Sequence, residues 1–188
     1  MAQRRTRKAI VMAVLTVLMS TFALAGPMLS RAEAYPNYCS TKKKGGTTKT
    51  TCIHITKIYG RTFTPYYRDG IYNDKKSSAT LTCTATTSKT MKYSVSASVK
   101  AEAGAIFAKV SGEISGGLER SVTTSYGSHV STKVPGHKTM FCDYGIYNYK
   151  FKGTVTRVTC VNVNCSSNSS KFSGRAPQRN HWHVYIGK

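Results

Sequence analysis

The side chains that could do chemistry are six cysteines, five histidines and only seven carboxylates. An even number of cysteines in an exported chain is typical of a disulfide framework, here three bridges with fifteen formal connectivities. There is no CxxC pair, and the cysteines and histidines do not cluster at the spacing of a zinc site. We therefore predict three disulfides and no thiol left over as a nucleophile. Sequence separation favours two local loops and one long loop: Cys39–Cys52, Cys160–Cys165 and Cys83–Cys142.

The histidines and carboxylates give little support to catalysis. His181 and His183 would share one face of a strand beside Trp182, a spacing that suits a metal, although an exposed strand edge is the favoured interpretation. Seven carboxylates leave little room for paired-carboxylate chemistry or an oxygen-ligand calcium site. No GxSxG, HExxH or glycine-rich phosphate loop is present. We predict a protein that is not an enzyme and needs no metal or cofactor.

The charge balance depends on the first 34 residues. The whole chain carries 28 basic and 7 acidic residues, a formal net charge of +21. Residues 1–8 hold four basic residues, residues 9–26 hold no charge, and Ala32-Glu33-Ala34 follows, which is the order of a cleaved signal peptide. The alternative is a retained anchor, since 18 uncharged residues come close to spanning a bilayer. We predict that 1–34 is removed and that a secreted, extracellular chain of net charge +17 remains.

Residues 81–142 alternate between apolar and polar side chains. The apolar positions are odd-numbered in 81–99 and mostly even-numbered in 122–142. Directly opposed residues of an antiparallel pair share a face, so the two numbers of each pair must add up to an odd sum. The sum for Cys83 and Cys142 is 225, which predicts a long two-stranded hairpin over about 81–142 with a disulfide at its base. This register gives the pairs Met91–Val134, Val95–Val130, Val99–Tyr126 and Ala103–Val122.

The tip of this hairpin, 101–121, departs from the alternation. Its larger apolar residues fit a helical stripe, whereas four glycines oppose a stable helix at about 1 kcal/mol each relative to alanine. The pattern leaves a strand or a short helix open, and it makes this stretch the candidate membrane or interface segment. The residues concerned are Ala103, Ile106, Phe107, Val110, Ile114 and Leu118.

Outside the hairpin the sequence predicts a single β-rich domain, 52–188, preceded by a flexible cationic arm, 35–51. The arm contains the only run of three basic residues, Lys42-Lys43-Lys44, and several threonines. Alternating strands recur from 147 onwards, interrupted by a Ser/Asn/Gly/Pro-rich loop at 166–180. The expected fold is all-β: a disulfide-bonded antiparallel β domain with the long hairpin and a possible short helix near its tip.

The Ser/Thr-rich strands MKYSVSASVKAEAGAIF and ERSVTTSYGSHVSTKVP, with the aromatic strand that follows, resemble the pore-forming module of the aerolysin-like toxins. The resemblance covers residues 81–155 and rests on the overall residue pattern rather than on an invariant motif. In that family, long strands bracket an amphipathic loop that refolds to insert into a membrane. The resemblance therefore implies a β-pore-forming toxin in which 101–121 inserts. No receptor-binding lectin domain accompanies the module here.

The chain is also similar in size and design to the small adaptor subunits of secreted bacterial umbrella toxin particles. That resemblance implies an N-terminal arm that adds as a strand to one partner while the β domain binds another. The arm residues concerned are Lys42, Lys43, Lys44, Ile53 and Ile55. A cationic domain of this kind would dock an acidic secreted protein partner quickly and with strong salt dependence.

The partners follow from charge and compartment. The basic residues are mostly dispersed over the polar faces of strands, which favours an anionic membrane, a cell-surface polymer or an acidic secreted protein. Aromatic and basic residues interleave at 59–72 and 144–151, as in proteins that stack nucleic-acid bases. An exported disulfide protein rarely meets nucleic acid, so nucleic acid is disfavoured. We predict a binding or assembling protein, with oligomers possible, that acts in competition or defence between cells.

Overall fold

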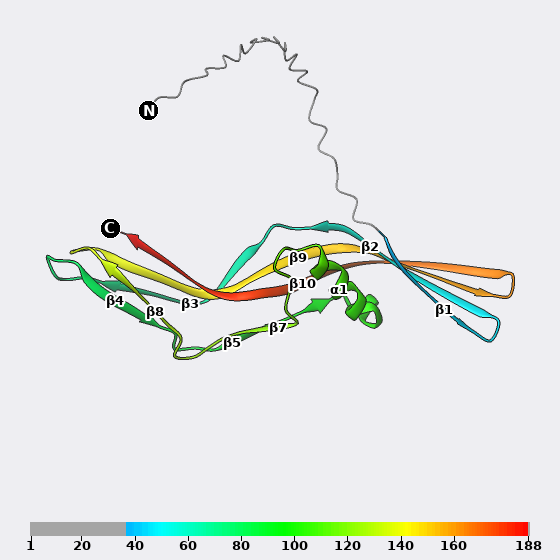
Figure 1. Ribbon diagram of the computed structural model, residues 1–188, viewed down its shortest axis with the longest axis horizontal. Helices are drawn as coiled ribbons and strands as arrows, with labels where there is room; N and C mark the ends of the chain where they lie inside the picture. Colours follow the sequence, from blue (N-terminus) through cyan, green and yellow to red (C-terminus); the bar gives the residue numbers. More distant parts are fainter. Residues whose placement is uncertain (1–36, 188) are drawn as a thin grey trace, which may run out of the picture. The chain divides into compact units, whose positions relative to one another are not determined.

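The computed structural model describes residues 37–187 and is all-β with one short helical segment (Figure 1). The predicted fold class is confirmed. The predicted signal peptide, 1–34, lies outside the described residues. Within them no helix is long and apolar enough to cross a membrane.

The central feature is a hairpin of two long strands, β9 (Thr139–Val161) and β10 (Asn164–Gly187) (Figure 1). Their pairs run from Thr139–Gly187 to Val161–Asn164, with one bulge at Gln178. On its other edge, β9 pairs with β3 (Thr62–Tyr72) along its first half and with β2 (Thr47–Ile58) along its second half. The outer strands of this sheet are β1 (Tyr38–Lys44) beside β2 and the short β6 (Ser94–Val95) beside β10.

The chain between β3 and β9 forms a second, interrupted hairpin. Strand β4 (Ala79–Thr84) pairs with β8 (His129–Val134), and β5 (Lys89–Lys92) pairs with β7 (Ser121–Thr124). Every pair in both ladders adds up to 213, so the two ladders are parts of one register. The tip is helical: η1 (Ala97–Glu102), a 3-10 helix, runs into α1 (Ala103–Gly112). We call residues 79–134 the insert, because they separate two strands that pair with each other.

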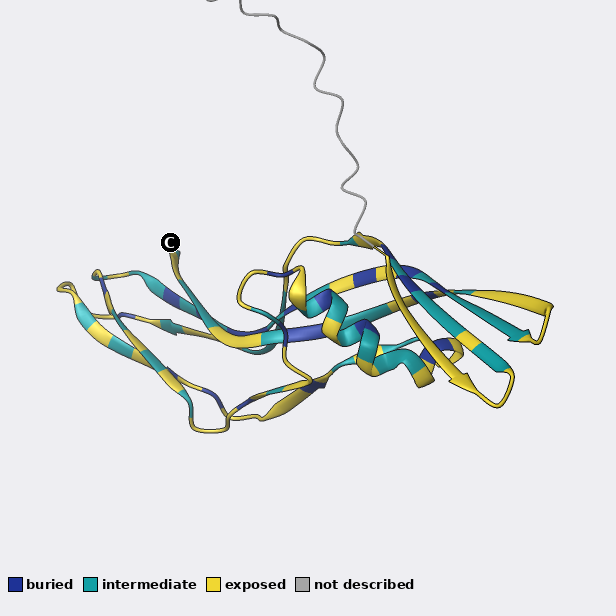
Figure 2. Ribbon diagram, turned by 45° about the vertical axis from the view of Figure 1, so that its right-hand side comes forward, coloured by how far each residue is buried: buried dark blue, intermediate teal, exposed yellow. Residues whose placement is uncertain are grey.

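Two hydrophobic clusters lie on opposite faces of β9. The first uses odd-numbered residues of its second half, such as Phe151 and Val155, and is covered by α1 (Figure 2). The second uses Met140 and Cys142, even-numbered residues of the first half, which pack against Cys83 and Val134 of the insert. Successive residues of a strand point to opposite faces, so the insert contacts both sides of the same ladder.

The hairpin register corrects the prediction in part. The odd sum is confirmed, but the sum is 213 and not 225, so Met91 lies opposite Val122 and Cys83 opposite Val130. The predicted pairs Met91–Val134, Val95–Val130, Val99–Tyr126 and Ala103–Val122 do not form. The reason is a turn after Val134, beyond which the chain leaves the insert and enters β9. The Cys83–Cys142 bridge therefore ties the insert to the central sheet.

Two segments predicted to be irregular are strands. Residues 166–180 belong to β10, and residues 38–44 and 47–51 belong to β1 and β2. Both are rich in polar residues, which the sequence pattern interprets as loop. Each is nevertheless opposed, residue by residue, to an alternating neighbour: β9 for 166–180 and β2 for β1. Cross-strand pairing, a tertiary effect, outweighs the local preference.

Candidate functional site

The candidate membrane or interface segment lies in the first hydrophobic cluster. Ile106 and Val110 are fully buried on α1, while Ile114 and Leu118 are buried in the chain that follows it. Phe107 is half-buried and packs against the cluster, whereas Ala103 is half-buried but is not part of it. The structure therefore brings together five of the six residues that the sequence singled out. They cover side chains of β2, β9 and β10: Ile53, Ile55, Phe151, Val155, Phe172 and Ala176.

The helix that presents these residues is weakly built. Gly104 and Gly112 lie within α1, and a Cβ added at either position meets nothing within 4 Å. Glycine in a helix costs about 1 kcal/mol relative to alanine, and no packing requirement offsets that cost here. The N-cap residue Glu102 makes no side-chain capping bond. The helix is held mainly by its contacts with the sheet.

One half-buried tyrosine links the helix to the sheet. The Tyr93 hydroxyl donates a hydrogen bond to the carbonyl of Ala103 at 2.8 Å. Its ring packs edge-on against Phe107 and stacks with Phe151, with centroid distances of 5.0 and 6.2 Å. Burial raises the pKa of Tyr93 to about 12, so the hydroxyl stays protonated and remains a donor at neutral pH.

An ion pair clamps the 3-10 helix to β9. Arg157 donates from Nε to Oε1 and from Nη2 to Oε2 of Glu102, both at 2.7 Å, and Nη2 also donates to the Ser98 carbonyl at 3.1 Å. These hydrogen bonds hold the pKa of Glu102 below its usual value. The clamp therefore requires an ionised Glu102 and weakens when that carboxylate takes up a proton.

The loop after α1 is fastened to the bulge of β10. The Ser111 hydroxyl accepts a hydrogen bond from the amide of Leu118 at 2.9 Å. Gln178, the bulged residue, donates from its side-chain amide to the carbonyl of Ser115 at 3.2 Å. Gly116 and Gly117 have φ values of +79° and +65°, a conformation that favours glycine. These contacts hold the C-terminal end of the helical tip against β10.

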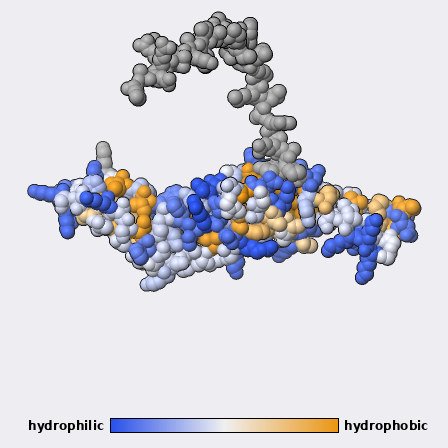
Figure 3. All heavy atoms as spheres, in the orientation of Figure 1, coloured by the Kyte–Doolittle hydropathy of each residue, from blue (hydrophilic) through white to orange (hydrophobic). Residues whose placement is uncertain are grey.

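The candidate partner-binding arm is divided by the structure. Lys42, Lys43 and Lys44 are exposed on β1, and Figure 3 shows hydrophilic residues gathered at the free end of the β1–β2 hairpin. Ile53 and Ile55 are each 1% exposed and belong to the core. The isoleucines cannot face a partner while the sheet is intact. The lysines and the outer edge of β1 can.

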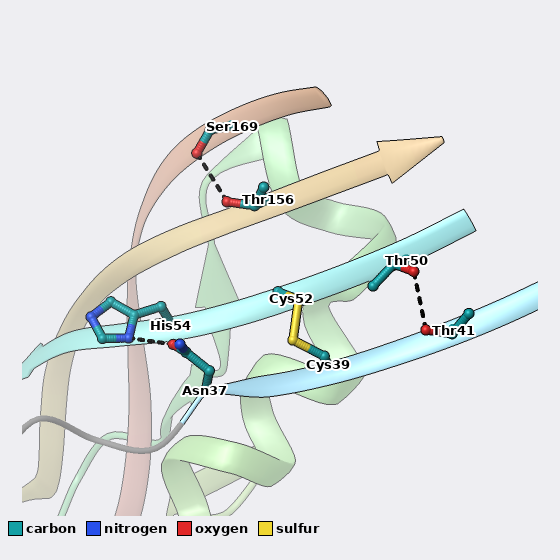
Figure 4. The surroundings of a disulfide bond; sticks show 8 residues. All are labelled: Asn37, Cys39, Thr41, Thr50, Cys52, His54, Thr156 and Ser169. Atoms are coloured by element: carbon teal, nitrogen blue, oxygen red, sulfur yellow. Dashed lines mark hydrogen bonds between the residues drawn. A yellow bond between two sulfur atoms is a disulfide. The ribbon is translucent and has the colours of Figure 1, made fainter. Parts of the chain in front are cut away.

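All three predicted disulfides are present, and within the described residues no cysteine is free. Cys39 and Cys52 lie directly opposite each other on β1 and β2 (Figure 4). Cys160 and Cys165 close the turn of the β9–β10 hairpin. Because Cys39 and Cys52 are bridged, the β1–β2 hairpin that contains the arm is covalently closed.

Aromatic and basic side chains gather on the first half of β9, and the sequence predicted only part of this arrangement. We call Arg61, Phe63, Tyr147, His181 and His183 the cationic aromatic cluster. His181 and His183 share a face of β10, as predicted, with ring centroids 5.2 Å apart. Phe63 stacks on His183 at 4.2 Å, and the guanidinium carbon of Arg61 lies 4.2 Å from the centre of the Tyr147 ring. The interleaving of aromatic and basic residues at 59–72 and 144–151 was the available signal. It did not show that β3, β9 and β10 would bring these side chains together.

The described residues contain no group of three or more His, Cys, Asp or Glu side chains arranged to hold a metal ion. Compared with known proteins, the chain matches no family model, no curated protein and no solved structure.

Proposed function

We propose that this protein is a secreted, non-enzymatic toxin-type protein that perforates membranes by converting residues 94–119 into a transmembrane β-hairpin. The observation that supports the proposal is the register of the insert. The β4–β8 and β5–β7 ladders share the sum 213, and that register can be continued through the helical tip.

The continued register sorts the tip into two faces. One face carries only apolar residues and glycines, and the other carries serines, charged residues and glycines. The turn falls at Ile106-Phe107, since 106 and 107 add up to 213. The apolar face consists of Val95, Ala97, Val99, Ala101, Ala103, Ala105, Ala108, Val110, Gly112, Ile114, Gly116 and Leu118. The polar face consists of Ser94, Ser96, Ser98, Lys100, Glu102, Gly104, Lys109, Ser111, Glu113, Ser115, Gly117 and Glu119.

This alternation is easily missed in the sequence. The apolar residues are odd-numbered before the turn and even-numbered after it, so no single period of two runs through 101–121. The register of the neighbouring ladders fixes the turn at 106–107, whereas the sum 225 would place it at 112–113. In the continued register Lys100 lies opposite Glu113, which is a favourable cross-strand pair.

The length of the apolar face suits a bilayer. The face extends over residues 95–105 and 108–118, and a strand that crosses a membrane needs about 9–11 residues. Tyr93 and Arg120, which the register places opposite each other, end the face on one side, and Phe107 lies at the turn. Aromatic residues at the limits of the apolar band are typical of membrane-spanning strands. A polar second face suits the water-filled side of a ring of such hairpins.

The conversion is local. The paired strands of the insert already have the required register, so only η1, α1 and the following loop must change conformation, and β6 must leave β10. Against conversion stand the burial of Ile106, Val110, Ile114 and Leu118, the Glu102–Arg157 pair and the contacts of Gln178. A membrane offers the apolar residues another place away from water, whereas the helix itself contributes little.

The experiment is a covalent lock. The hydroxyl oxygens of Ser96 and Ser173 lie 3.5 Å apart, so S96C/S173C can form a bridge that keeps the tip on β10. The single variants S96C and S173C are the matched controls. We expect the single variants to release dye from anionic liposomes and to form ring-sized oligomers, and the bridged variant to do neither. Equal leakage from the bridged variant, with the bridge verified by mass spectrometry, would contradict the proposal.

A second function, that of a non-enzymatic adaptor in a secreted antibacterial particle, is favoured by β1. Its seven residues are all exposed, and it forms the end of the described sheet, so its outer edge can accept a strand from another protein. The test is co-purification of larger secreted proteins from the native culture. Partners that are lost on removing residues 35–44 together with C52S, in a protein that causes no leakage, would favour the adaptor.

A further inference from the structure

The cationic aromatic cluster borders a cavity at the bulge of β10. The cavity measures about 290 Å³ and is lined by Arg61, Ser115, Gly116, Gln178 and Arg179. The Tyr147 ring lies 4.2 Å from the guanidinium carbon of Arg61 and 6.0 Å from that of Arg179. Two arginines from different parts of the chain are thus held on one aromatic ring beside an open cavity.

Positive charge is concentrated here without compensation. In the described residues neither Arg61 nor Arg179 takes part in an ion pair. The pKa of His181 is lowered, first by burial and then by the neighbouring charges of His183, Arg179 and Arg61. The acid on this face is Asp143, opposite His183, and it pairs with Arg68 at 3.4 Å. Clustered charges of one sign are unfavourable alone and become favourable when an anion binds between them.

The Gln178 side chain, which lines the cavity, also carries an unsatisfied acceptor. Its Oε1 atom is shielded from solvent and has no hydrogen-bond partner among the described residues, while its amide nitrogen donates to the carbonyls of Ser115 and Gly117. A buried acceptor without a partner costs free energy, so it favours a ligand that brings a donor. A hydroxyl group is such a donor. The cavity lining therefore offers two guanidinium groups for an anion and a glutamine side chain whose acceptor lacks a partner.

We propose that this cavity binds the phosphate ester of a polyol, with the phosphate between Arg61 and Arg179 and a hydroxyl of the polyol on Gln178. Planar guanidinium groups match the paired oxygens of a phosphate. The chemistry is that of a glycerophosphate, whether free or as the head group of a phospholipid. As a membrane contact the inference rests on the proposed function, because Ser115 and Gly116 belong to the tip segment. Binding a lipid head group here brings that segment to the membrane surface.

The experiment measures binding of the full secreted chain to phosphatidylcholine vesicles with and without phosphatidylglycerol, and to free glycerol 3-phosphate. The test variant is R61Q/R179Q. The matched control is K150Q/K171Q, which removes the same charge from exposed positions outside the cluster. We expect R61Q/R179Q to weaken binding to phosphatidylglycerol vesicles about tenfold or more, since charge-assisted hydrogen bonds are lost, and the control to weaken it much less. Thermal unfolding of both variants verifies that they fold.

The outcomes separate the sources and the two proposals. Competition by millimolar glycerol 3-phosphate supports the site, and binding of glycerol 3-phosphate without binding to vesicles assigns it to a free polyol phosphate. Equal weakening by the control, or binding of an acidic protein but of no polyol phosphate, overturns the site. Vesicle binding that depends on Arg61 and Arg179 but causes no leakage overturns pore formation and leaves the site intact. If leakage is unchanged in R61Q/R179Q and glycerol 3-phosphate does not bind, the phosphate site is overturned and pore formation is left intact.

Discussion

The β9–β10 hairpin and the insert begin from the same kind of sequence and reach different structures. Both alternate apolar with polar residues, and both form antiparallel ladders. The β9–β10 ladder runs, with a single bulge at Gln178, to a turn that is closed by Cys160–Cys165, and β9 has neighbours on both edges. The insert ladder is interrupted between β4–β8 and β5–β7 and ends in a helix, with no disulfide across it in the described residues. Alternation alone therefore does not fix a hairpin; neighbours and cross-links do.

The largest difference between the two hairpins is expected in the contribution of their disulfides to stability. C83S/C142S opens a loop with a sequence separation of 59, whereas C160S/C165S opens one of 5. Loop-closure entropy then lowers the free energy of unfolding by about 4 kcal/mol for the first pair and about 2 kcal/mol for the second. Urea titration of the two double variants measures both values. Equal losses would mean that the insert is not held to the sheet by its bridge.

The second prediction concerns the glycines of α1. G104A/G112A puts methyl groups into open space and raises helix propensity by about 2 kcal/mol in total. If the helix competes with the continued hairpin, the variant unfolds at higher temperature and releases dye from liposomes more slowly. S166A on exposed β10 is the matched control and should change neither. A variant that is more stable but leaks at the wild-type rate would separate the helix from membrane activity.

Much of this comparison could be predicted from local pattern, and part of it could not. The pairing of the cysteines, the alternation of the insert and the apolar stripe of the tip are local features. By contrast, Cys142 looks like a continuation of the insert until the turn after Val134 places it in β9. Residues 166–180 look like a loop because serines and asparagines favour turns, and only their pairing with β9 makes them a strand. The cavity at Gln178 is lined by three separate segments of the chain and has no sequence signature.

The third prediction uses the ion pair that holds η1 on β9. The pKa of Glu102 is lowered by Arg157, so its stabilising contribution is present above the unfolded pKa near 4.5 and is lost as the pH falls through the lower folded value. A partly exposed ion pair contributes about 1 kcal/mol. Acidification below pH 4.5 should therefore weaken the attachment of the tip to β9 and speed leakage. In E102Q the tip should be weakly attached already at pH 7, so leakage should respond less to acid. Leakage rates between pH 7 and 4 measure the difference. E119Q is the control, because Glu119 is exposed and forms no ion pair with any of residues 37–187.

The smallest effect is expected at His181, where protonation lowers the stability of the free protein but is favoured when a phosphate is bound. Because its folded pKa is lowered, the unfolded chain takes up the proton more readily, and wild-type stability falls as the pH drops below about 6.5. H181Q removes that dependence. A phosphate between Arg61 and Arg179 offsets the repulsion and favours the protonated ring. Glycerol 3-phosphate itself loses part of its negative charge between pH 7 and pH 5, so H181Q serves as the reference. The increment in melting temperature at pH 5, relative to the increment at pH 7, should be larger in the wild type than in H181Q. An equal ratio in the two proteins would show that the anion does not lie beside His181.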